Sequence, residues 1–225
     1  MKRSQINAAI HKMEALAKKH GFLLPPFCHF TPDDWQGKDH SYDEIRATML
    51  GWDVTDYGKG NFAETGFTLI TIRNGILNHE KYNKAYAEKL LMLEEGQYSP
   101  MHFHWYKMED IINRGGGTAL ITVYNSTPEE DFADTPVTVM MDGRHFTVPA
   151  GTEIRLTPGD SITIPPYLYH DFKVEAGTGD VLLGEVSMCN DDANDNRFYE
   201  PLGRFPEIEE DEAPYRLLCN EYPVL

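Results

Sequence analysis

Two segments of the chain, residues 96–116 and 159–170, contain side chains that could bind one metal ion. His102 and His104 are separated by one residue, so on a β-strand both imidazoles would point to the same face. Glu109 follows in the same segment, and His170 ends the second one. Three imidazoles and a carboxylate suit a divalent transition metal better than Ca²⁺ or Mg²⁺. A single histidine on a strand is usually a hydrogen-bonded structural residue, so the predicted metal site depends on the whole set.

Short apolar runs separated by Gly, Pro, Asn and Asp begin near residue 67 and must supply the strands that position these side chains. Asp142-Gly143 is a strong signal for a two-residue hairpin, and residues 157–160 form a second turn signal. Many short strands at close spacing indicate an antiparallel sandwich or barrel. The predicted strands are 67–72, 89–93, 101–107, 119–124, 137–141, 144–148, 153–156, 161–164, 171–174 and 181–186.

The region before these strands is predicted to be largely helical. Residues 4–20 repeat apolar side chains at helical spacing after Ser4, which we expect to cap the helix, and Gly21 ends the pattern. A second, short helix is predicted to open at Ser41, because Glu44 lies three residues later in a capping-box pattern. Both helices are expected to cover an edge or face of the sheet.

Composition restricts the class of protein and its partners. A chain of 225 residues can form one domain with its own core, and a net charge of −16 argues against a nucleic-acid partner. Neither a signal peptide at the start nor an apolar stretch long enough to cross a membrane is evident. Three cysteines without C-x-x-C spacing indicate a reduced protein, and we expect a cytoplasmic location.

The two segments resemble the two sequence motifs of the cupin superfamily. Tyr167 departs from the second motif, because it stands where the family has glycine. This resemblance implies a mainly β fold, a cupin antiparallel β-barrel or jelly roll with N-terminal helices packed outside. It further implies a single cupin domain over residues 1–225, with a helical extension (1–60), a barrel core (67–187) and a C-terminal wrap (190–225). The matching positions are Gly96, His102, His104, Glu109 and Gly116 in the first motif and Gly159, Pro165 and His170 in the second.

A wider similarity involves the start of the chain, residues 102–117 and residues 184–198, which together look like the cupin-type D-lyxose isomerases. That resemblance implies interconversion of D-lyxose with D-xylulose, and commonly of D-mannose with D-fructose. It implies a homodimer that acts on free sugars and depends on Mn²⁺, for which Co²⁺, Fe²⁺ or Zn²⁺ could substitute. His102, His104, Glu109 and His170 fall on the metal ligands of that family.

Isomerisation of an aldose also needs groups that move protons, and Lys107 is our first candidate. Strand alternation would place it opposite His104, so a bend near the strand end is required, and burial beside a cation would then lower its pKa. Glu200 is the expected carboxylate partner, in a polar segment flanked by aromatic residues. Glu185 is the alternative, as a lone charge in an apolar run that either faces inward or lies on the solvent face. Glu185, Asp192, Trp105 and Tyr167 are candidate sugar contacts.

Two other functions remain open from the sequence. Three histidines and one glutamate also serve Fe(II)-dependent cupin dioxygenases, which would consume oxygen. A cupin that binds sugar without turnover would keep its function after His104→Ala. For the isomerase we predict proton transfer through an enediol rather than a hydride shift.

Overall fold

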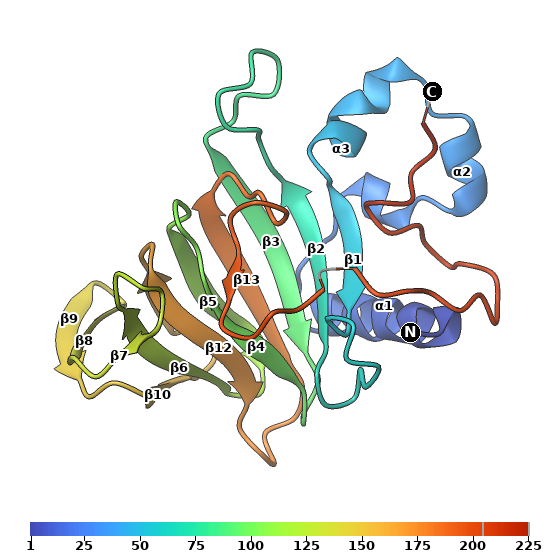
Figure 1. The fold of residues 1–225 in the computed structure, drawn as a ribbon. Helices are drawn as coiled ribbons and strands as arrows, with labels where there is room; N and C mark the ends of the chain where they lie inside the picture. The colour runs from blue at the N-terminus through green and yellow to red at the C-terminus, as the bar shows by residue number, and fades with distance from the viewer. Residues whose placement is uncertain (204, 225) are drawn as a thin grey trace.

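The computed structural model describes residues 1–203 and 205–224, and its main feature is a pair of curled β-sheets that face each other (Figure 1). One sheet has eight strands in the order β1-β2-β3-β13-β5-β11-β8-β9. The other has the order β10-β6-β12-β4-β14, with β7 pairing to β6. Neighbouring strands in the described part are antiparallel, which confirms the predicted mainly β, antiparallel fold.

The elements have the following bounds. The helices are α1 (Arg3–Lys19), η1 (Pro26–His29), α2 (Pro32–Gln36), η2 (His40–Tyr42) and α3 (Asp43–Ala47). The strands are β1 (Gly51–Thr55), β2 (Phe67–Arg73), β3 (Tyr86–Leu93), β4 (Tyr98–Phe103), β5 (Glu109–Gly116), β6 (Ala119–Ser126), β7 (Phe132–Ala133), β8 (Val137–Met141), β9 (Arg144–Val148), β10 (Thr152–Leu156), β11 (Ser161–Ile164), β12 (Leu168–Val174), β13 (Val181–Met188) and β14 (Arg197–Phe198).

The space between the sheets is apolar at one end and charged at the other, and strand alternation explains both. Leu91 on β3 and Leu183 on β13 are paired in register and belong to the core between the sheets. Two residues along each strand, on the same face, the pair becomes Lys89 and Glu185. β3 and β13 therefore contribute an apolar pair to the core and, two residues further along, a charged pair on the same face.

Helix α1 packs against the outside of the eight-stranded sheet. Its apolar residues Ile6, Ile10 and Met13 form a second core with Val54 of β1 and Ile70 of β2. This confirms the prediction that an N-terminal helix lies outside the barrel. Burial of this apolar stripe, rather than helix propensity alone, holds the helix in place.

The predicted start of α1 was wrong in detail. The helix begins at Arg3, with Lys2 as its N-cap residue, and Ser4 lies inside it. The Ser4 N–H and hydroxyl both donate to the carboxylate of Asp211, at 2.9 and 2.7 Å. A side chain from the other end of the chain therefore satisfies part of the helix start, which no local pattern could indicate.

The short helices also differ from the prediction. A capping box is instead formed by Thr31 and Asp34 at the start of α2. Ser41 instead lies in η2, where its N–H donates to Asp39, and α3 begins only at Asp43. The Thr31/Asp34 and Ser41/Glu44 patterns look alike in sequence. The Thr31 pattern is followed by a proline at the first helical position, which favours a helix start there.

Four strands were missed: β1, β5, β7 and β14. β1 lies within residues 1–60, where only helix was expected, and it forms the edge of the eight-stranded sheet. The predicted strand 101–107 was wrong beyond Phe103, where β4 ends. His104 and Lys107 therefore lie in the loop that leads from β4 in one sheet to β5 in the other.

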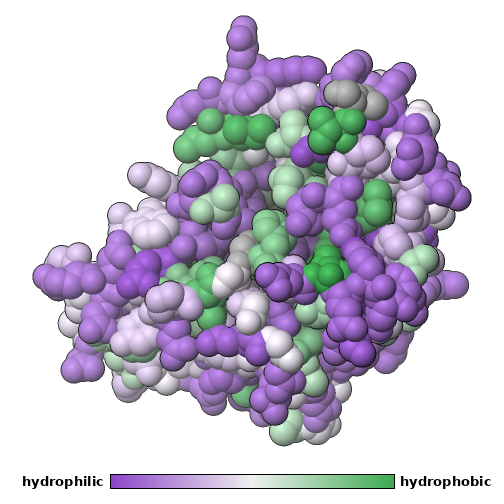
Figure 2. Space-filling view, turned by 45° about the vertical axis from the view of Figure 1, so that its right-hand side comes forward, coloured by the Kyte–Doolittle hydropathy of each residue, from purple (hydrophilic) through white to green (hydrophobic). Residues whose placement is uncertain are grey.

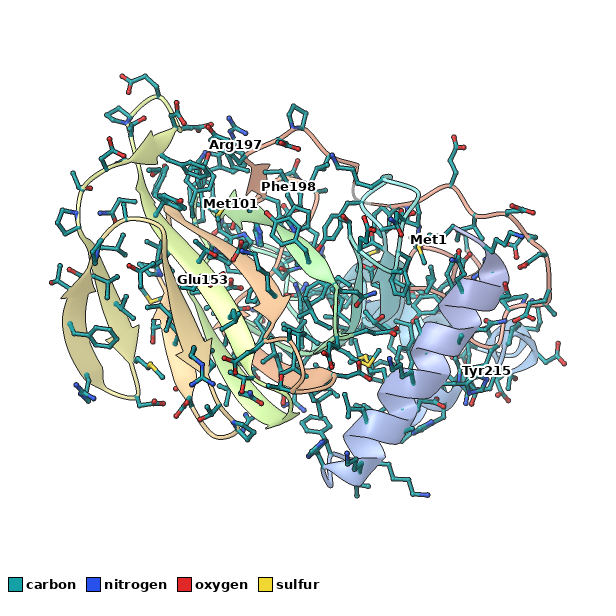
Figure 3. The ribbon with its side chains drawn as sticks, turned by 90° about the horizontal axis from the view of Figure 1, so that it is seen from below. Met1, Met101, Glu153, Arg197, Phe198 and Tyr215 are labelled. Atoms are coloured by element: carbon teal, nitrogen blue, oxygen red, sulfur yellow. The ribbon has the colours of Figure 1, made fainter. Side chains whose placement is uncertain are left out.

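The C-terminal part of the chain runs from the end of the barrel back to α1. β14 pairs with β4, and Figure 3 shows Arg197, Phe198 and Met101 gathered at one end of the sheets. Further on, Tyr215 lies beside α1 and its hydroxyl donates to Glu14 (3.0 Å). The segment therefore connects the open end of the barrel to the N-terminal helix.

The face of the molecule seen in Figure 2 is mainly polar. Figure 2 shows hydrophilic residues over most of one face, with hydrophobic residues in small separate groups. No helix in residues 1–203 and 205–224 combines the length and apolar character needed to span a bilayer.

Candidate functional site

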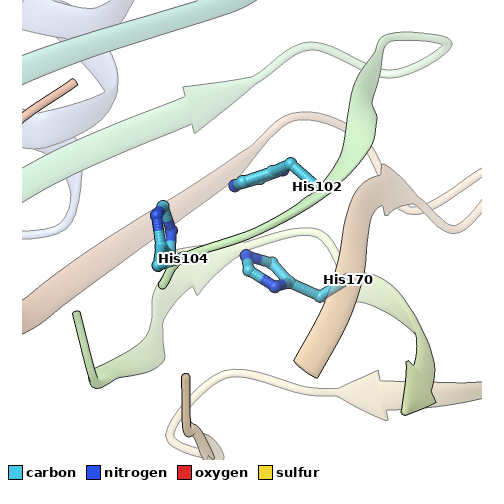
Figure 4. Close-up of side chains that lie close together, drawn as sticks. All are labelled: His102, His104 and His170. Carbon is cyan, nitrogen blue, oxygen red and sulfur yellow. The ribbon is translucent and has the colours of Figure 1, made fainter. Parts of the chain in front are cut away.

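Three histidine side chains meet between the two sheets (Figure 4). His102 on β4 and His170 on β12 are paired in register, and their ring centroids are 4.2 Å apart. The ring of His104, just beyond the end of β4, lies 5.1 Å from that of His102 and 5.6 Å from that of His170. One nitrogen of each ring lies within 4.8 Å of those of the other two, close enough to share one metal ion.

Each of the three rings is oriented by a backbone carbonyl. His102 Nδ1 lies 2.8 Å from Pro100 O, His104 Nδ1 lies 2.7 Å from Asp195 O, and His170 Nδ1 lies 3.0 Å from Leu168 O. A carbonyl can only accept, so each Nδ1 carries a proton, and in a neutral ring the lone pair is then on Nε2. A backbone carbonyl that accepts from Nδ1 in this way prepares a histidine to bind a metal through Nε2.

The carboxylate of Glu109, the first residue of β5, completes the group. Its Oε1 lies 3.2 Å from His170 Nε2 and 3.4 Å from His104 Nε2, and the side chain is buried. Its Oε2 lies 2.7 Å from the Nζ of Lys107. The structure therefore brings together the four predicted ligands, from β4, the β4–β5 loop, β5 and β12.

The pKa shifts of His102, His104 and Glu109 favour the protonation states in which these side chains bind a cation. Burial, and the neighbouring histidines, hold the pKa of His102 well below its usual range, and burial and Lys107 lower the pKa of His104. Although burial opposes it, Lys107 and His104 hold the pKa of Glu109 well below its usual range. Neutral imidazoles and an ionised carboxylate are the forms that bind metals.

Two buried histidine nitrogens without hydrogen bonds show whether these residues fit a metal. Among the described residues, Nε2 of His104 and Nε2 of His170 are fully buried and neither makes a hydrogen bond. Buried polar atoms in proteins are nearly always satisfied, so such a pair aimed at one carboxylate requires a partner. A divalent metal supplies one, and the residues fit it.

Lys107 faces the same space, although strand alternation had predicted the opposite face. Because β4 ends at Phe103, the loop can turn the side chain inward, where it is only 3% exposed. Burial lowers its pKa as expected, whereas the carboxylates of Glu109, Glu185 and Asp192, which that expectation left out, outweigh burial and raise the pKa of Lys107. Lys107 is therefore an ammonium ion that can donate a proton or a hydrogen bond.

Glu185, rather than Glu200, is the carboxylate beside Lys107. Glu185 Oε1 accepts from Lys107 Nζ at 3.0 Å and from the Ser187 hydroxyl at 3.0 Å. The prediction of Glu200 as the partner was wrong, because its side chain is 74% exposed and lies 3.5 Å from Lys59. Glu200 follows β14 in the chain and does not line the small cavity.

Lys89 is a member of the site that the sequence reasoning missed. Its Nζ donates to Asn190 Oδ1 (2.6 Å) and lies 3.7 Å from Glu185 and 3.5 Å from Asp192. Like Glu185 it is almost fully buried. Strand alternation back from Leu91 would have placed it on the inward face, and an inward lysine in an apolar run was the available signal.

Two of the four predicted sugar contacts lie elsewhere. The indole of Trp105 donates to Glu130 (2.8 Å), outside the described cavities. Tyr167 is 50% exposed, and its φ of +62° explains why glycine is usual at this turn position. Asp192 and Glu185 do line the cavity, as predicted for residues that contact a sugar.

The cavity at this site is small and adjoins a larger one. About 50 Å³ of open space lies between the histidines and the charged residues, bordered also by Tyr57, Phe172 and Phe198. A neighbouring cavity of about 430 Å³ extends toward Asp53, Thr71 and Asn74. Lys107 and Asp192 line both. The arrangement therefore places a candidate cation site, an ammonium ion and the buried carboxylate of Glu185 around one small cavity.

Comparison with known proteins agrees with this arrangement. The family model described as D-lyxose isomerase matches residues 1–222. The "D-lyxose/D-mannose isomerase" of Escherichia coli O157:H7 is 48% identical over 223 residues, which cover 99% of this chain and 98% of that protein. The protein of the same name from Serratia proteamaculans is also 48% identical, with the same coverage.

A solved structure supports the fold independently. The L-ribose isomerase of Geodermatophilus obscurus has a TM-score of 0.61 to this chain at 13% identity, covering 92% of this chain and 98% of that one. With the barrel described above, this confirms the predicted cupin-type fold. The family match decides against the two alternatives left open by the sequence, a dioxygenase and a non-catalytic binder. The chain therefore belongs to the D-lyxose isomerase family and is an aldose–ketose isomerase.

Proposed function

We propose that this enzyme interconverts D-lyxose with D-xylulose, and D-mannose with D-fructose, with Mn²⁺ as its metal. The observation that carries the proposal is the position of Glu109 between two groups. One of its oxygens faces the histidine nitrogens, and the other contacts Lys107, which in turn contacts Glu185. A cation site and a proton-transfer pair are therefore next to each other, as isomerisation of a hydroxyaldehyde requires.

His102, His104, His170 and Glu109 would hold the metal. When bound, a divalent cation acts as a Lewis acid that polarises the sugar carbonyl and stabilises negative charge on the C1 and C2 oxygens. Manganese is favoured over zinc because four protein ligands already complete the usual tetrahedral zinc site and leave no place for a substrate. The specificity of the family's named members for D-lyxose and D-mannose supports the choice of sugars.

Glu185 and Lys107 would carry the protons. In the aldose-to-ketose direction, Glu185 removes the proton from C2 while the Lys107 ammonium gives a proton to the carbonyl oxygen at C1. This gives an enediol and a neutral lysine, which then takes the proton of the C2 hydroxyl while Glu185 returns its proton to C1 and the C2 carbonyl forms. Both side chains end in the protonation state in which they began, so the atoms and charges balance over one turnover. Both side chains are almost fully buried, which keeps bulk water away from the enediol.

The direct test is an assay of metal-stripped protein against a panel of free aldoses, with Mn²⁺, Co²⁺, Fe²⁺ or Zn²⁺ added separately. We expect the highest kcat/KM with D-lyxose, activity with D-mannose, and the best recovery with Mn²⁺. Turnover of neither sugar with any of the metals would contradict the proposal. A preference for Zn²⁺ would keep the reaction and overturn the choice of metal.

The route of the hydrogen has its own test. Under single-turnover conditions in deuterated water, the enediol route predicts solvent deuterium at C1 in a fraction of the ketose, because the proton held by Glu185 can exchange with solvent before it is returned, and mass spectrometry or NMR measures that fraction. Product without solvent deuterium would instead favour a hydride shift between C2 and C1.

We further propose that the enzyme is a homodimer. Four large apolar side chains lie exposed along the outer face where β3, β13 and the start of β5 meet: Tyr86, Met108, Val186 and Met188. Pairing of this face with a second copy would cover it. Light scattering during size exclusion should give twice the mass of 25.7 kDa for the wild type, and Val186→Asp should shift the mass toward the monomer. A monomeric wild type would contradict this.

A cytoplasmic location is also proposed, because Cys28 and Cys189 are free thiols and the three cysteines of the chain lack C-x-x-C spacing. Cell fractionation tests it, with recovery in the periplasmic or extracellular fraction as the contradicting result.

A further inference from the structure

A short segment after β13, residues 190–196, crosses the front of the two sheets (Figure 1). We refer to it as the strap. Asp192 and Asn196 of the strap line the small cavity. At its first residue, the Asn190 N–H donates to Asn74 (2.8 Å), and Asn190 Oδ1 accepts from Lys89 (2.6 Å). The strap is therefore fixed to the eight-stranded sheet at its beginning.

Asp195 fixes the other end of the strap to the β4–β5 loop through three hydrogen bonds. Its Oδ1 accepts from the N–H of Tyr106 at 2.9 Å, and its Oδ2 accepts from the N–H of Lys107 at 3.0 Å. Its backbone carbonyl accepts from His104 Nδ1 at 2.7 Å. Asp195 is only 7% exposed, so these bonds are shielded from water.

The backbone of the β4–β5 loop must be held by contacts other than strand pairing. Residues 104–108 lie outside any strand, because β4 ends at Phe103 and β5 begins at Glu109. Within this irregular stretch, His104 carries a proposed metal ligand and Lys107 the proposed proton donor. Two backbone N–H groups of the stretch are satisfied by one buried carboxylate, which does the work that pairing to a neighbouring strand does elsewhere.

We infer that Asp195 is a positioning residue, which sets the orientation of His104 toward the metal and of Lys107 toward Glu185 at the same time. The effect on Lys107 rests on the proposed function, because it concerns catalysis. The effect on His104 concerns metal binding and rests on the geometry of this chain alone. Asp195 touches neither the proposed ligand atoms nor the Lys107 ammonium. Its effect passes through the imidazole ring and the loop backbone.

Asp195→Asn is the informative variant. The amide keeps one acceptor but turns an NH₂ group toward one of the two loop N–H groups. It therefore cannot accept from the N–H groups of both Tyr106 and Lys107. We expect the dissociation constant for Mn²⁺, measured by calorimetry on metal-stripped protein, to rise about tenfold or more. The visible absorption spectrum of the Co²⁺-loaded protein should change as the His104 ring reorients. In the assay, kcat should fall by about tenfold, with a smaller change in KM.

Asp56→Asn is a matched control. Asp56 is also buried, and its two carboxylate oxygens accept from the N–H groups of Gly58 (3.0 Å) and Gly60 (3.1 Å), in a loop without proposed ligands. We expect this variant to lose thermal stability to a similar degree while keeping its Mn²⁺ affinity and Co²⁺ spectrum. The comparison separates loss of a buried carboxylate clamp from loss of metal-site geometry.

The inference is overturned if Asp195→Asn lowers only the melting temperature and keeps both the Mn²⁺ affinity and the Co²⁺ spectrum of the wild type. If circular dichroism shows that Asp195→Asn does not fold, Asp195→Ser, whose hydroxyl can accept one of the two N–H groups, decides by the same measurements. Failure of the wild type to isomerise D-lyxose would sink the proposed function instead. The metal readouts need no substrate, so the two failures are distinguishable.

Discussion

The two sides of the cavity achieve their chemistry in different ways. On the imidazole side (His102, His104 and His170), every ring is oriented by a backbone carbonyl, and burial keeps His102 and His104 neutral. On the charged side (Lys89, Lys107 and Glu185), the side chains hold one another through ion pairs. Glu109 contacts both sides. Metal affinity therefore depends on backbone geometry, whereas proton transfer depends on the balance of buried charges. Mutations should be able to change metal affinity and proton transfer separately.

The largest effect should come from removing the base on the charged side. Glu185→Gln keeps the size of the side chain but cannot take a proton, so kcat should fall about 10³-fold, within the range for loss of a general base. Mn²⁺ affinity should stay close to that of the wild type, because Glu185 is not among the four proposed ligands. Steady-state kinetics at saturating Mn²⁺ and calorimetry measure the two quantities. A parallel loss of metal binding would show that the two sides are not separable.

The complementary change on the imidazole side is His170→Ala. Mutation of a residue that supports a metal ligand typically costs 10–100-fold in affinity, so loss of a ligand itself should weaken Mn²⁺ binding by more than about 100-fold. Activity should return in part as Mn²⁺ is raised, unlike that of Glu185→Gln. His145→Ala, in the distant exposed strand β9, is the control. Unchanged Mn²⁺ affinity in His170→Ala would remove this histidine from the site.

A smaller effect is expected for Lys89→Met, which removes a buried cation beside Glu185 and frees the strap at Asn190. A hydrogen bond to a charged group is worth about 1.5–3 kcal/mol, so kcat/KM should fall by at least about tenfold. Lys173→Met removes a partly exposed lysine that also lies beside carboxylates, and it should leave kcat/KM unchanged. Equal effects of the two substitutions would mean that Lys89 contributes only general charge.

The smallest effect should belong to Glu200→Gln. The exposed pair between Glu200 and Lys59 is worth less than about 1 kcal/mol. We therefore expect kcat within about twofold of the wild type, since the cavity wall is intact. A loss comparable to that of Glu185→Gln would restore Glu200 as the catalytic carboxylate and contradict the assignment made from the structure.

Much of the fold and the metal-site geometry was predictable because the signals are local. Alternation on a strand places His102 correctly, and the spacing to Glu109 and His170 identifies the rest of the group. Hairpin and turn residues fixed most strand limits, as for the hairpin at Asp142, whose flanking strands have the predicted bounds.

The rest depended on contacts between distant parts of the chain. Alternation from His104 gave the wrong face for Lys107, because the strand ends early and Asp195, far along the chain, holds the loop in its turn. The choice between Glu185 and Glu200 required the path of the chain after β13, which no local pattern contains. Trp105 lies beside the ligands in sequence, yet its partner is Glu130 on another loop.

We expect three imidazoles and Glu109 to share one cation next to the Lys107–Glu185 pair. A crystal structure of the protein loaded with Mn²⁺, with data collected at the manganese absorption edge, tests this directly. It should show one strong anomalous peak bonded to Nε2 of His102, His104 and His170 and to a carboxylate oxygen of Glu109. A peak elsewhere, or a Glu109 that stays on Lys107 without touching the ion, would contradict it.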